Sequence, residues 1–504
     1  MNRILLAFTL LLIPSLHALA APPDAERHAA ALFDSLDSQP ARLRILMRDL
    51  PKGADLHNHL SGAVYAESYL TWARDTGLCL SATTHALSPP PCAAGTASGE
   101  ILNHTPGLYD ATIDAFSMRD YTPAPGDASG HDHFFNAFAK FDLAGRDHAG
   151  EMLAEVANRA ANDHVLYLEL MHYPLVRESA ELGLAHPWHG EDFAHDLDEI
   201  RPGIPALVQE ARQRTDMAEA RMRSVLQCGT PQAQPGCMVK IRYLTQLIRI
   251  LPPQAVFSQM AYSYALVKAD PRFLGVNIVA PEDNPVALRD YDLHMRAFRY
   301  LSSVDPSVKL TLHAGELTEG LVPPEDLRFH IRDAIEIAGA SRIGHGVDVT
   351  YERDPRGLMA EMARRHVAVE INLTSNDVIL GVKGADHPFQ AYRAAGVPLV
   401  LSTDDEGVSR IDMTHEYLRA TLTYGLHYAD LKQLSRNSLT YSFLPGDSLW
   451  SLSNGHVIPA CAGTTPGLKA DAACNVLLAH SEKARTQWQL EADFHSFEQS
   501  LLRQ

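Results

Sequence analysis

Short apolar runs recur along the chain, and many of them end in a polar or charged side chain. Several of these runs are followed by a segment in which apolar positions return with helical spacing. A short apolar run predicts a buried strand, and regular alternation with helical segments predicts a parallel sheet. Eight strands are predicted, at 54–57, 165–170, 239–243, 273–278, 309–313, 342–345, 368–371 and 398–402.

Helical periodicity is clear at 326–338, 355–365 and 415–424. Eight strands with intervening helices favour an α/β fold of the (β/α)₈ TIM-type barrel class. In that fold the reactive residues lie at the C-terminal ends of the strands. An open doubly wound sheet is the alternative, but no glycine-rich phosphate-binding turn follows the first predicted strand.

Two long stretches interrupt this alternation and are predicted as insertions, near 77–130 and near 171–236. The barrel domain that contains them is expected to span 51–450. A helical N-terminal extension is predicted at 21–50. The remaining segment, 451–504, is expected to hold a disulfide-bonded loop and a helix.

The first 20 residues have the pattern of a signal peptide. Arg3 precedes an apolar run at 4–14, and small residues at Ala18 and Ala20 provide a cleavage site. The run is shorter than the ~20 residues that span a bilayer. We therefore expect a secreted or periplasmic protein without membrane attachment after cleavage; the alternative is an N-terminal core helix.

The charge balance limits the expected partners. The chain has 504 residues, with 43 Lys and Arg against 61 Asp and Glu, and a formal net charge of −18. Nucleic-acid binding requires many basic side chains to neutralise phosphates, so this balance argues against it. The 46% hydrophobic and 21% charged residues are typical of a globular protein and exclude the disordered and fibrous classes.

The six cysteines form three local couples, each bracketing a loop rich in small residues and proline. None is a Cys-x-x-Cys motif, which argues against a zinc ribbon or a thioredoxin-like site. The alternative of six unpaired thiols fits an exported protein less well. Nearest-neighbour pairing predicts the disulfides Cys79–Cys92, Cys228–Cys237 and Cys461–Cys474.

Candidate chemistry begins where the first strand ends. His57 and His59 are two residues apart, so their imidazoles lie on the same side of a strand and could bind one metal ion. The pattern alone is weak evidence, because His131 and His133 repeat it elsewhere in this chain.

Other strand ends add further candidate ligands. His313 and Glu316 follow the fifth predicted strand, His345 ends the sixth, and Asp404 and Asp405 follow the eighth. Imidazole and carboxylate groups suit Zn²⁺, with one position left open for water. Their shared position on the barrel makes a metal centre a better explanation than separate structural roles.

Together these motifs resemble the adenosine deaminase family in order and spacing. The resemblance covers about 50–450, apart from the insertions, and looks most like the secreted, growth-factor-related branch, although exported bacterial relatives would look similar. The residues that carry it are His57-Asn58-His59, His313-Ala314-Gly315-Glu316, Arg342-Ile343-Gly344-His345-Gly346, Thr374-Ser375-Asn376, Ser402-Thr403-Asp404-Asp405, Ser442-Phe443-Leu444-Pro445 and an aromatic segment at 133–141.

The resemblance implies a role for each matching residue. Glu316 would protonate purine N1, and His345 would orient the attacking water and could take its proton. Asp405 would act with them by bonding the five-membered ring of the base. One Zn²⁺ per chain would be held by His57, His59, His313 and Asp404. Substrate contacts would come from His59, Ser61, Phe138, Ala280 and Asp405.

The implied reaction is zinc-dependent hydrolytic deamination of adenosine or 2′-deoxyadenosine to inosine or 2′-deoxyinosine, with release of ammonia. Zinc lowers the pKa of a bound water towards ~7 and so makes a nucleophile at neutral pH. Attack at C6 places charge on N1, where a positioned acid stabilises the transition state. The alternative substrates are other 6-amino purines, namely a 5′-modified adenosine, adenine or AMP.

Two positions depart from the family pattern. Ser61 replaces an Asp that contacts the sugar 5′-hydroxyl, and Ala280 replaces a Gly whose N–H reaches purine N3. The N–H of Ala280 can still reach N3 if its φ is negative, whereas a positive φ would lower purine affinity. Only Lys52 and Arg74 are close in sequence to the first motif, so an unphosphorylated nucleoside is expected, with tolerance at the 5′ position.

Three other functions remain to be weighed. A binuclear hydrolase on the same barrel needs a bridging group at the end of the fourth strand, commonly a modified Lys, and Asn277 and its neighbours offer none. A secreted signalling protein and a nucleoside-binding module are the others, and a complete ligand set with Glu316 argues against both. In the secreted branch an N-terminal extension serves dimerisation, so a homodimer is also expected.

Overall fold

The computed structural model describes residues 24–453 and 455–503. The signal peptide predicted at 1–20 lies outside these residues. Eight parallel strands form one sheet in the order β1-β4-β5-β6-β7-β8-β9-β10, which confirms the barrel. The strands are β1 (Gly53–His59), β4 (Val165–His172), β5 (Lys240–Ile248), β6 (Phe273–Val279), β7 (Lys309–Ala314), β8 (Arg342–His345), β9 (Ala368–Ile371) and β10 (Leu399–Leu401).

The ring closes through the residue that follows the last strand. The Asp404 N–H donates to the His57 carbonyl at 2.8 Å, and the His59 N–H donates to the Asp404 carbonyl at 3.1 Å. This bridge joins β10 to β1 at the end of the barrel where both candidate ligand motifs lie. All eight predicted strands are therefore present, each within two residues of its predicted start.

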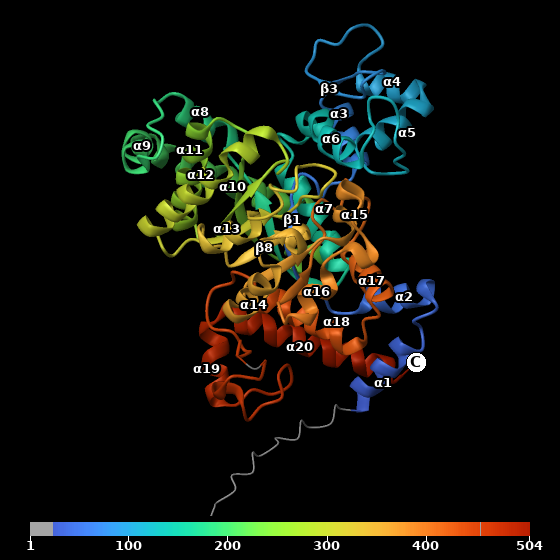
Figure 1. Cartoon of the computed structure of the whole chain (residues 1–504). Coiled ribbons are helices and arrows are strands. Elements are labelled where there is room, and N and C mark those ends of the chain that lie inside the picture. Colours follow the sequence, from blue (N-terminus) through green and yellow to red (C-terminus); the bar gives the residue numbers. More distant parts are fainter. Residues whose placement is uncertain (1–23, 454, 504) are drawn as a thin grey trace, which may run out of the picture.

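Helices surround the strands (Figure 1) and cover the outer face of the barrel, while the inward-facing side chains fill its interior, so nearly all strand residues are buried. These helices are α3 (Ala66–Asp75), α6 (Gly130–Gly145), α7 (Ala149–Asn162), α11 (Pro253–Ala269), α12 (Pro285–Val304), α13 (His330–Glu336), α14 (Pro355–Arg365), α15 (Leu373–Leu380), α16 (Phe389–Ala394), α17 (Met413–Tyr424) and α18 (Tyr428–Thr440). Short 3₁₀ turns lie at Arg201–Gly203, Pro235–Met238, Val347–Tyr351, Gly384–Asp386 and Pro459–Cys461.

The three helices expected from periodicity are present, one of them shorter than predicted. Helix α14 has the predicted bounds, and α17 begins two residues before the predicted start. Helix α13 begins at His330, because the imidazole of that residue turns inward to bond Glu282. It ends before Gly339, whose φ of 84° stops the helix.

Both predicted insertions fold into small helical units at the top of the view in Figure 1. The first contains the hairpin β2 (Cys79–Leu80) and β3 (Leu87–Ser88), with α4 (Ser98–His104) and α5 (Pro106–Ala115). The second contains α8 (Val176–Leu184), α9 (Phe193–Ile200) and α10 (Ile204–Val225).

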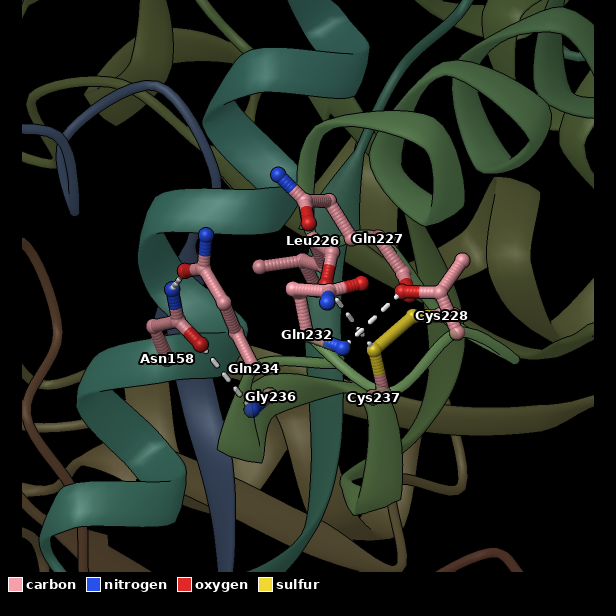
Figure 2. Close-up of a disulfide and its surroundings, with 9 residues drawn as sticks. Asn158, Leu226, Gln227, Cys228, Gln232, Gln234, Gly236 and Cys237 are labelled. Atoms are coloured by element: carbon pink, nitrogen blue, oxygen red, sulfur yellow. Dashed lines mark hydrogen bonds between the residues drawn. A yellow bond between two sulfur atoms is a disulfide. The ribbon is translucent and has the colours of Figure 1, made fainter.

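All three predicted disulfides are present, joining Cys79 to Cys92, Cys228 to Cys237 and Cys461 to Cys474. The second closes a loop that is anchored to the barrel. Figure 2 shows Asn158 of α7 accepting from the Gly236 N–H at 2.9 Å and donating to Gln234. No free cysteine occurs in the described part of the chain.

The N-terminal helices α1 (Asp24–Asp34) and α2 (Pro40–Asp49) pack on the same end of the barrel as the C-terminal helices α19 (Ala472–His480) and α20 (Glu482–Leu501). The Phe33 ring lies 5.2 Å from the Tyr428 ring and 6.4 Å from the Phe497 ring. The extension thus buries its apolar face against its own chain. Among residues 24–453 and 455–503, no helix is both long enough and apolar enough to cross a membrane.

Candidate metal centre and active site

Four side chains from three places on the barrel converge at the C-terminal ends of the strands. The Nε2 atom of His313 lies 3.1 Å from Nε2 of His57 and 3.3 Å from Nε2 of His59. Asp404 Oδ1 lies 3.4 Å from Nε2 of His57 and 3.3 Å from Nε2 of His59. Around a metal with bonds of about 2.0–2.1 Å, tetrahedral ligands are about 3.3 Å apart, and these four separations are close to that value. The side chains whose ligand atoms all lie within 4.8 Å of one another are His57, His313, His345 and Asp404, and His59 forms a second such group with Asp404 and Asp405.

The other nitrogen of each histidine is held by an acceptor from a neighbouring strand. Glu370 Oε2 lies 2.7 Å from Nδ1 of His57, and Gln246 Oε1 lies 2.8 Å from Nδ1 of His59. Asn277 Oδ1 also accepts the backbone N–H groups of Ile278 and His313, so its oxygen must face Nδ1 of His313 at 2.9 Å. Such outer partners fix the tautomer and the direction of ligating imidazoles.

This hydrogen-bond pattern is a test of whether a cation fits. With each Nδ1 carrying the proton, three Nε2 lone pairs and one carboxylate oxygen point at one another. Burial and the neighbouring imidazoles hold the pKa of His313 well below its usual range. Burial lowers the pKa of His57, but hydrogen bonds to Asp404 and Glu370 raise it to about 10. The donor set of imidazole nitrogens and one carboxylate oxygen is of the kind that suits a divalent cation such as Zn²⁺.

Glu370 itself is held by a buried cation. Arg342 Nε donates to Glu370 at 2.5 Å, and the guanidinium also donates to Glu169 at 2.7 Å. Burial raises the pKa of Glu370, but Arg342 and His57 lower it to about 2. Glu370, which orients His57, is therefore ionised. Arg342 is only 1% exposed, and its guanidinium pairs with both Glu370 and Glu169.

Glu316 and His345 lie beside the ligands. Glu316 Oε1 is 3.6 Å from His345 Nδ1, and His345 Nε2 is 3.8 Å from Asp404 Oδ2. Burial, with the charges of Asp404 and Glu282, raises the pKa of Glu316 to about 8. Glu282 accepts the backbone N–H groups of Gly315 and Glu316 and so fixes the turn that presents this carboxyl.

Comparison with known proteins agrees with this geometry. The adenosine deaminase family model matches residues 125–455, which is more than half of the chain. The chain belongs to the adenosine deaminase family. The adenosine deaminase of Clostridium perfringens is 30% identical over 185 residues, which are 36% of this chain and 51% of that protein. That of Shewanella loihica is 36% identical over 141 residues, 28% of this chain and 39% of that protein, so the matches span about half of these relatives or less.

Solved structures show the same fold at lower identity. The N6-methyl-AMP deaminase of Arabidopsis thaliana has a TM-score of 0.53 at 20% identity, covering 80% of this chain and 94% of that chain. A zinc-bound amidohydrolase from Burkholderia ambifaria has a TM-score of 0.55 at 18% identity, covering 92% and 96%. These likenesses support the barrel assignment of this adenosine deaminase family member.

Asp405 and Ala280 both lie at the mouth of the barrel. Burial and the charge of Asp404 raise the pKa of Asp405 well above its usual range. Gly62 packs so closely on the Asp405 carboxyl that a Cβ there would overlap it. Ala280 has a φ of 82°, so the condition for unstrained contact with purine N3, a negative φ, is not met. A family glycine would adopt this conformation without a Cβ penalty.

The other two predicted contact residues, Ser61 and Phe138, have the following surroundings. The Ser61 carbonyl accepts from the Tyr69 hydroxyl at 2.6 Å. Phe138 of α6 is partly buried in an aromatic cluster, with its ring 5.5 Å from Phe134 and 5.2 Å from Phe141.

The second His-x-His pattern is not a metal motif. His131 bonds Asp283 and Asp132, whereas His133 bonds Asp127 and two backbone carbonyls, so the two side chains serve separate contacts. Another group of ligand type, on and just before α9, has two exposed histidines: it comprises His189, His195 and Glu199.

Several residues that shape the site were absent from the predicted set. Gln246, Asn277 and Glu370 hold the three ligand histidines, and Glu282 holds the Glu316 turn. One sequence signal was available, because Glu370 is a charged residue inside the otherwise apolar strand Ala368–Ile371. The amides carry no such signal, since their role depends on the register of β5 and β6 against the neighbouring strands.

Proposed function

We propose that this protein is a zinc-dependent aminohydrolase that converts adenosine and 2′-deoxyadenosine to inosine and 2′-deoxyinosine, with release of ammonia. The observation that carries the proposal is the buried cluster of three imidazoles and one carboxylate beside Glu316. The resemblance in sequence motifs assigns these residues to the family's ligand and acid positions. The curated adenosine deaminases support the reaction class.

The residues of this chain suit the steps of such a reaction. A zinc ion held by the four ligands would lower the pKa of water towards about 7 and so supply the nucleophile. With a pKa raised to about 8, Glu316 is protonated at neutral pH and can donate to purine N1 as C6 is attacked. The C6–N bond then breaks, ammonia leaves, and the ring keeps the water oxygen at C6.

Asp405 is suited to hold the five-membered ring of the base. Burial and the charge of Asp404 favour the neutral form of its carboxyl, which could donate a hydrogen bond to purine N7, an acceptor. Its Oδ1 is buried and has no partner among the described residues. A purine would supply the missing partner.

The cations nearest the site favour a nucleoside over a nucleotide. Arg342 is committed to Glu169 and Glu370. Arg249, 1% exposed, donates to the carbonyls of Ile278 and His313 behind the site. Arg249 also pairs with Glu282, with 3.7 Å between Nη1 and the carboxylate, and both guanidinium groups are only 1% exposed. We therefore propose an unphosphorylated substrate with tolerance at the 5′ position.

The test is turnover of a substrate series by the purified, zinc-loaded protein, followed by the change in ultraviolet absorbance on deamination. We expect kcat/KM to be highest for adenosine and 2′-deoxyadenosine, with 5′-deoxyadenosine within ~100-fold. A preference for AMP or adenine would refute the substrate assignment and leave another 6-amino purine deaminase, as in the solved N6-methyl-AMP and adenine deaminases. No turnover of any of them would favour a nucleoside-binding or signalling protein.

We further propose that the mature protein is secreted or periplasmic. The signal-peptide pattern at 1–20 and three disulfides in the described chain support an oxidising compartment. Helix α1 of the N-terminal extension packs on α20 of its own chain. The expected homodimer remains a prediction, which light scattering of the purified protein can test.

A further inference from the structure

A buried line of hydrogen bonds runs from a helix N-terminus to His345. The Phe389 N–H, at the start of α16, lies 3.1 Å from Nδ1 of His387. Nε2 of His387 lies 3.0 Å from Oδ1 of Asn376, whose Nδ2 lies 2.9 Å from Nδ1 of His345. His387 is 3% exposed, and Asn376 and His345 are fully buried.

The first group in this line sets the direction of all the others. A backbone N–H can only donate, so Nδ1 of His387 is the acceptor. Burial lowers the pKa of His387 to about 4, so the neutral ring carries its single proton on Nε2 and donates it to Asn376. The amide must then present its oxygen to His387 and its NH₂ group to His345.

The consequence reaches the reacting side of His345. Its Nδ1 accepts from Asn376, and Nδ2 of Asn372 also faces that nitrogen at 3.5 Å. Because Nδ1 accepts a hydrogen bond, it carries no proton, so the single ring proton of His345 lies on Nε2. That Nε2 is buried without a hydrogen-bond partner among the described residues and lies 3.8 Å from Asp404.

We propose that His387 is a positioning residue that holds His345 in the Nε2–H tautomer. This inference rests on the proposed deaminase function for its catalytic meaning. His345 then meets the attacking oxygen as a hydrogen-bond donor that orients it, and its Nε2 has no lone pair with which to act as a base. Of the two roles expected for His345, the structure favours orientation over proton abstraction.

The helix end explains why the line starts where it does. The first N–H groups of a helix have no partner within the helix. At α16 the residue before Phe389 is Pro388, which has no N–H of its own. The His387 ring therefore accepts from the first available N–H donor of α16. This hydrogen bond fixes the donor and acceptor at every later step from His387 to His345.

Nitrogen-15 NMR of histidine-labelled protein measures the tautomer directly. Signals of His345 are assigned by their loss in His345→Gln. We expect a protonated Nε2 and an unprotonated Nδ1 in the wild-type protein. His387→Gln should preserve this pattern, because a glutamine amide keeps one acceptor and one donor. His387→Leu removes both and should leave the His345 tautomer mixed.

Kinetics provide a second measure of the same effect. Loss of an outer partner typically costs about 10–100-fold, so His387→Leu should lower kcat by that factor with KM changed by less than about twofold. His387→Gln should recover most of kcat. His294→Leu is the matched control, because His294 is equally buried but lies on α12, outside this line; it should leave the His345 signals unchanged.

If His387→Leu does not fold, Asn376→Asp decides the matter. A carboxylate accepts from both sides, so it should move the His345 proton to Nδ1, which the same spectra detect. A wild-type spectrum with protonated Nδ1, or a His345 pattern unchanged in both His387→Leu and Asn376→Asp, would overturn the proposal. Because the spectra need no turnover, a protein inactive on all purines would refute the proposed function alone.

Discussion

Ala280 offers a sharp test of how this site departs from its family. It lies directly after β6 with a φ of 82°, a conformation that an L-residue with a Cβ adopts at a cost of about 1–2 kcal/mol. Glycine at this position removes that strain but gains conformational entropy when unfolded, which offsets about 0.4–1 kcal/mol. We therefore expect Ala280→Gly to raise the free energy of unfolding by about 0.5–1 kcal/mol.

The same substitution should improve substrate binding. Without the Cβ, the N–H at this position can approach purine N3 more closely, and a neutral hydrogen bond contributes about 0.5–1.5 kcal/mol. KM for adenosine should fall by about two- to tenfold, with kcat nearly unchanged, because the contact is equally available in the ground state and the transition state.

The assay pairs initial rates on adenosine with thermal unfolding of the zinc-loaded protein. Ala340→Gly is the matched control, because Ala340 is buried, lies outside the site and has no positive φ. It should lower the melting temperature and leave KM unchanged. If Ala280→Gly lowers the melting temperature as much as the control does, backbone strain at this position is refuted. An unchanged KM would refute the contact with N3.

Four further predictions address the acid, the metal, an outer partner of the metal site and pH. Glu316→Gln should keep its metal but lose about 10²–10⁴-fold in kcat, and retention of more than about a tenth of the activity would exclude Glu316 as the proton donor. Elemental analysis after gel filtration should find one zinc ion per chain. The His195→Ala variant is used for this measurement, because it removes the exposed group at α9 that could bind a second ion. Two zinc ions per chain would contradict the mononuclear centre. In the same His195→Ala background Glu370→Gln should weaken zinc binding by about 10–100-fold in chelator competition, and equal affinity would show that orientation of His57 matters little. Burial lowers the pKa of His294 to about 4, so below pH ~6.5 the unfolded chain binds a proton at this residue that the folded chain does not, and the free energy of unfolding falls as the pH falls. His294→Leu should therefore reduce the loss of stability between pH 7 and pH 5 by about 2 kcal/mol, measured by urea unfolding. An unchanged loss would contradict this.

The strands and disulfides could be predicted because their signals are local. A barrel strand buried on both faces is a short apolar run, and β8 and β9 have the predicted bounds. The cysteines of each couple are 9 or 13 residues apart, so the paired thiols are already close in an unfolded loop. Helix α13 was predicted too long, because apolar spacing continues into turns that His330 and Gly339 interrupt.

The candidate ligands could be picked out from the sequence, because strand ends are marked by polar residues after apolar runs. Their outer partners could not, apart from Glu370. Gln246 and Asn277 face ligand histidines only because β5 and β6 have a particular register beside β1 and β7. A shift of one residue would turn each amide to the other face of its strand.

Backbone geometry at the site follows the same principle. Asp404 and His345 have φ values of 59° and 68°, a region that costs free energy for residues other than glycine. Asp404 remains there because its backbone closes the barrel against His57 and His59, and the same turn directs its carboxylate at their imidazoles. Closure of the sheet therefore also sets the position of Asp404 among the candidate ligands. A variant that loosens the β10–β1 bridge should lose metal affinity even though every ligand is retained.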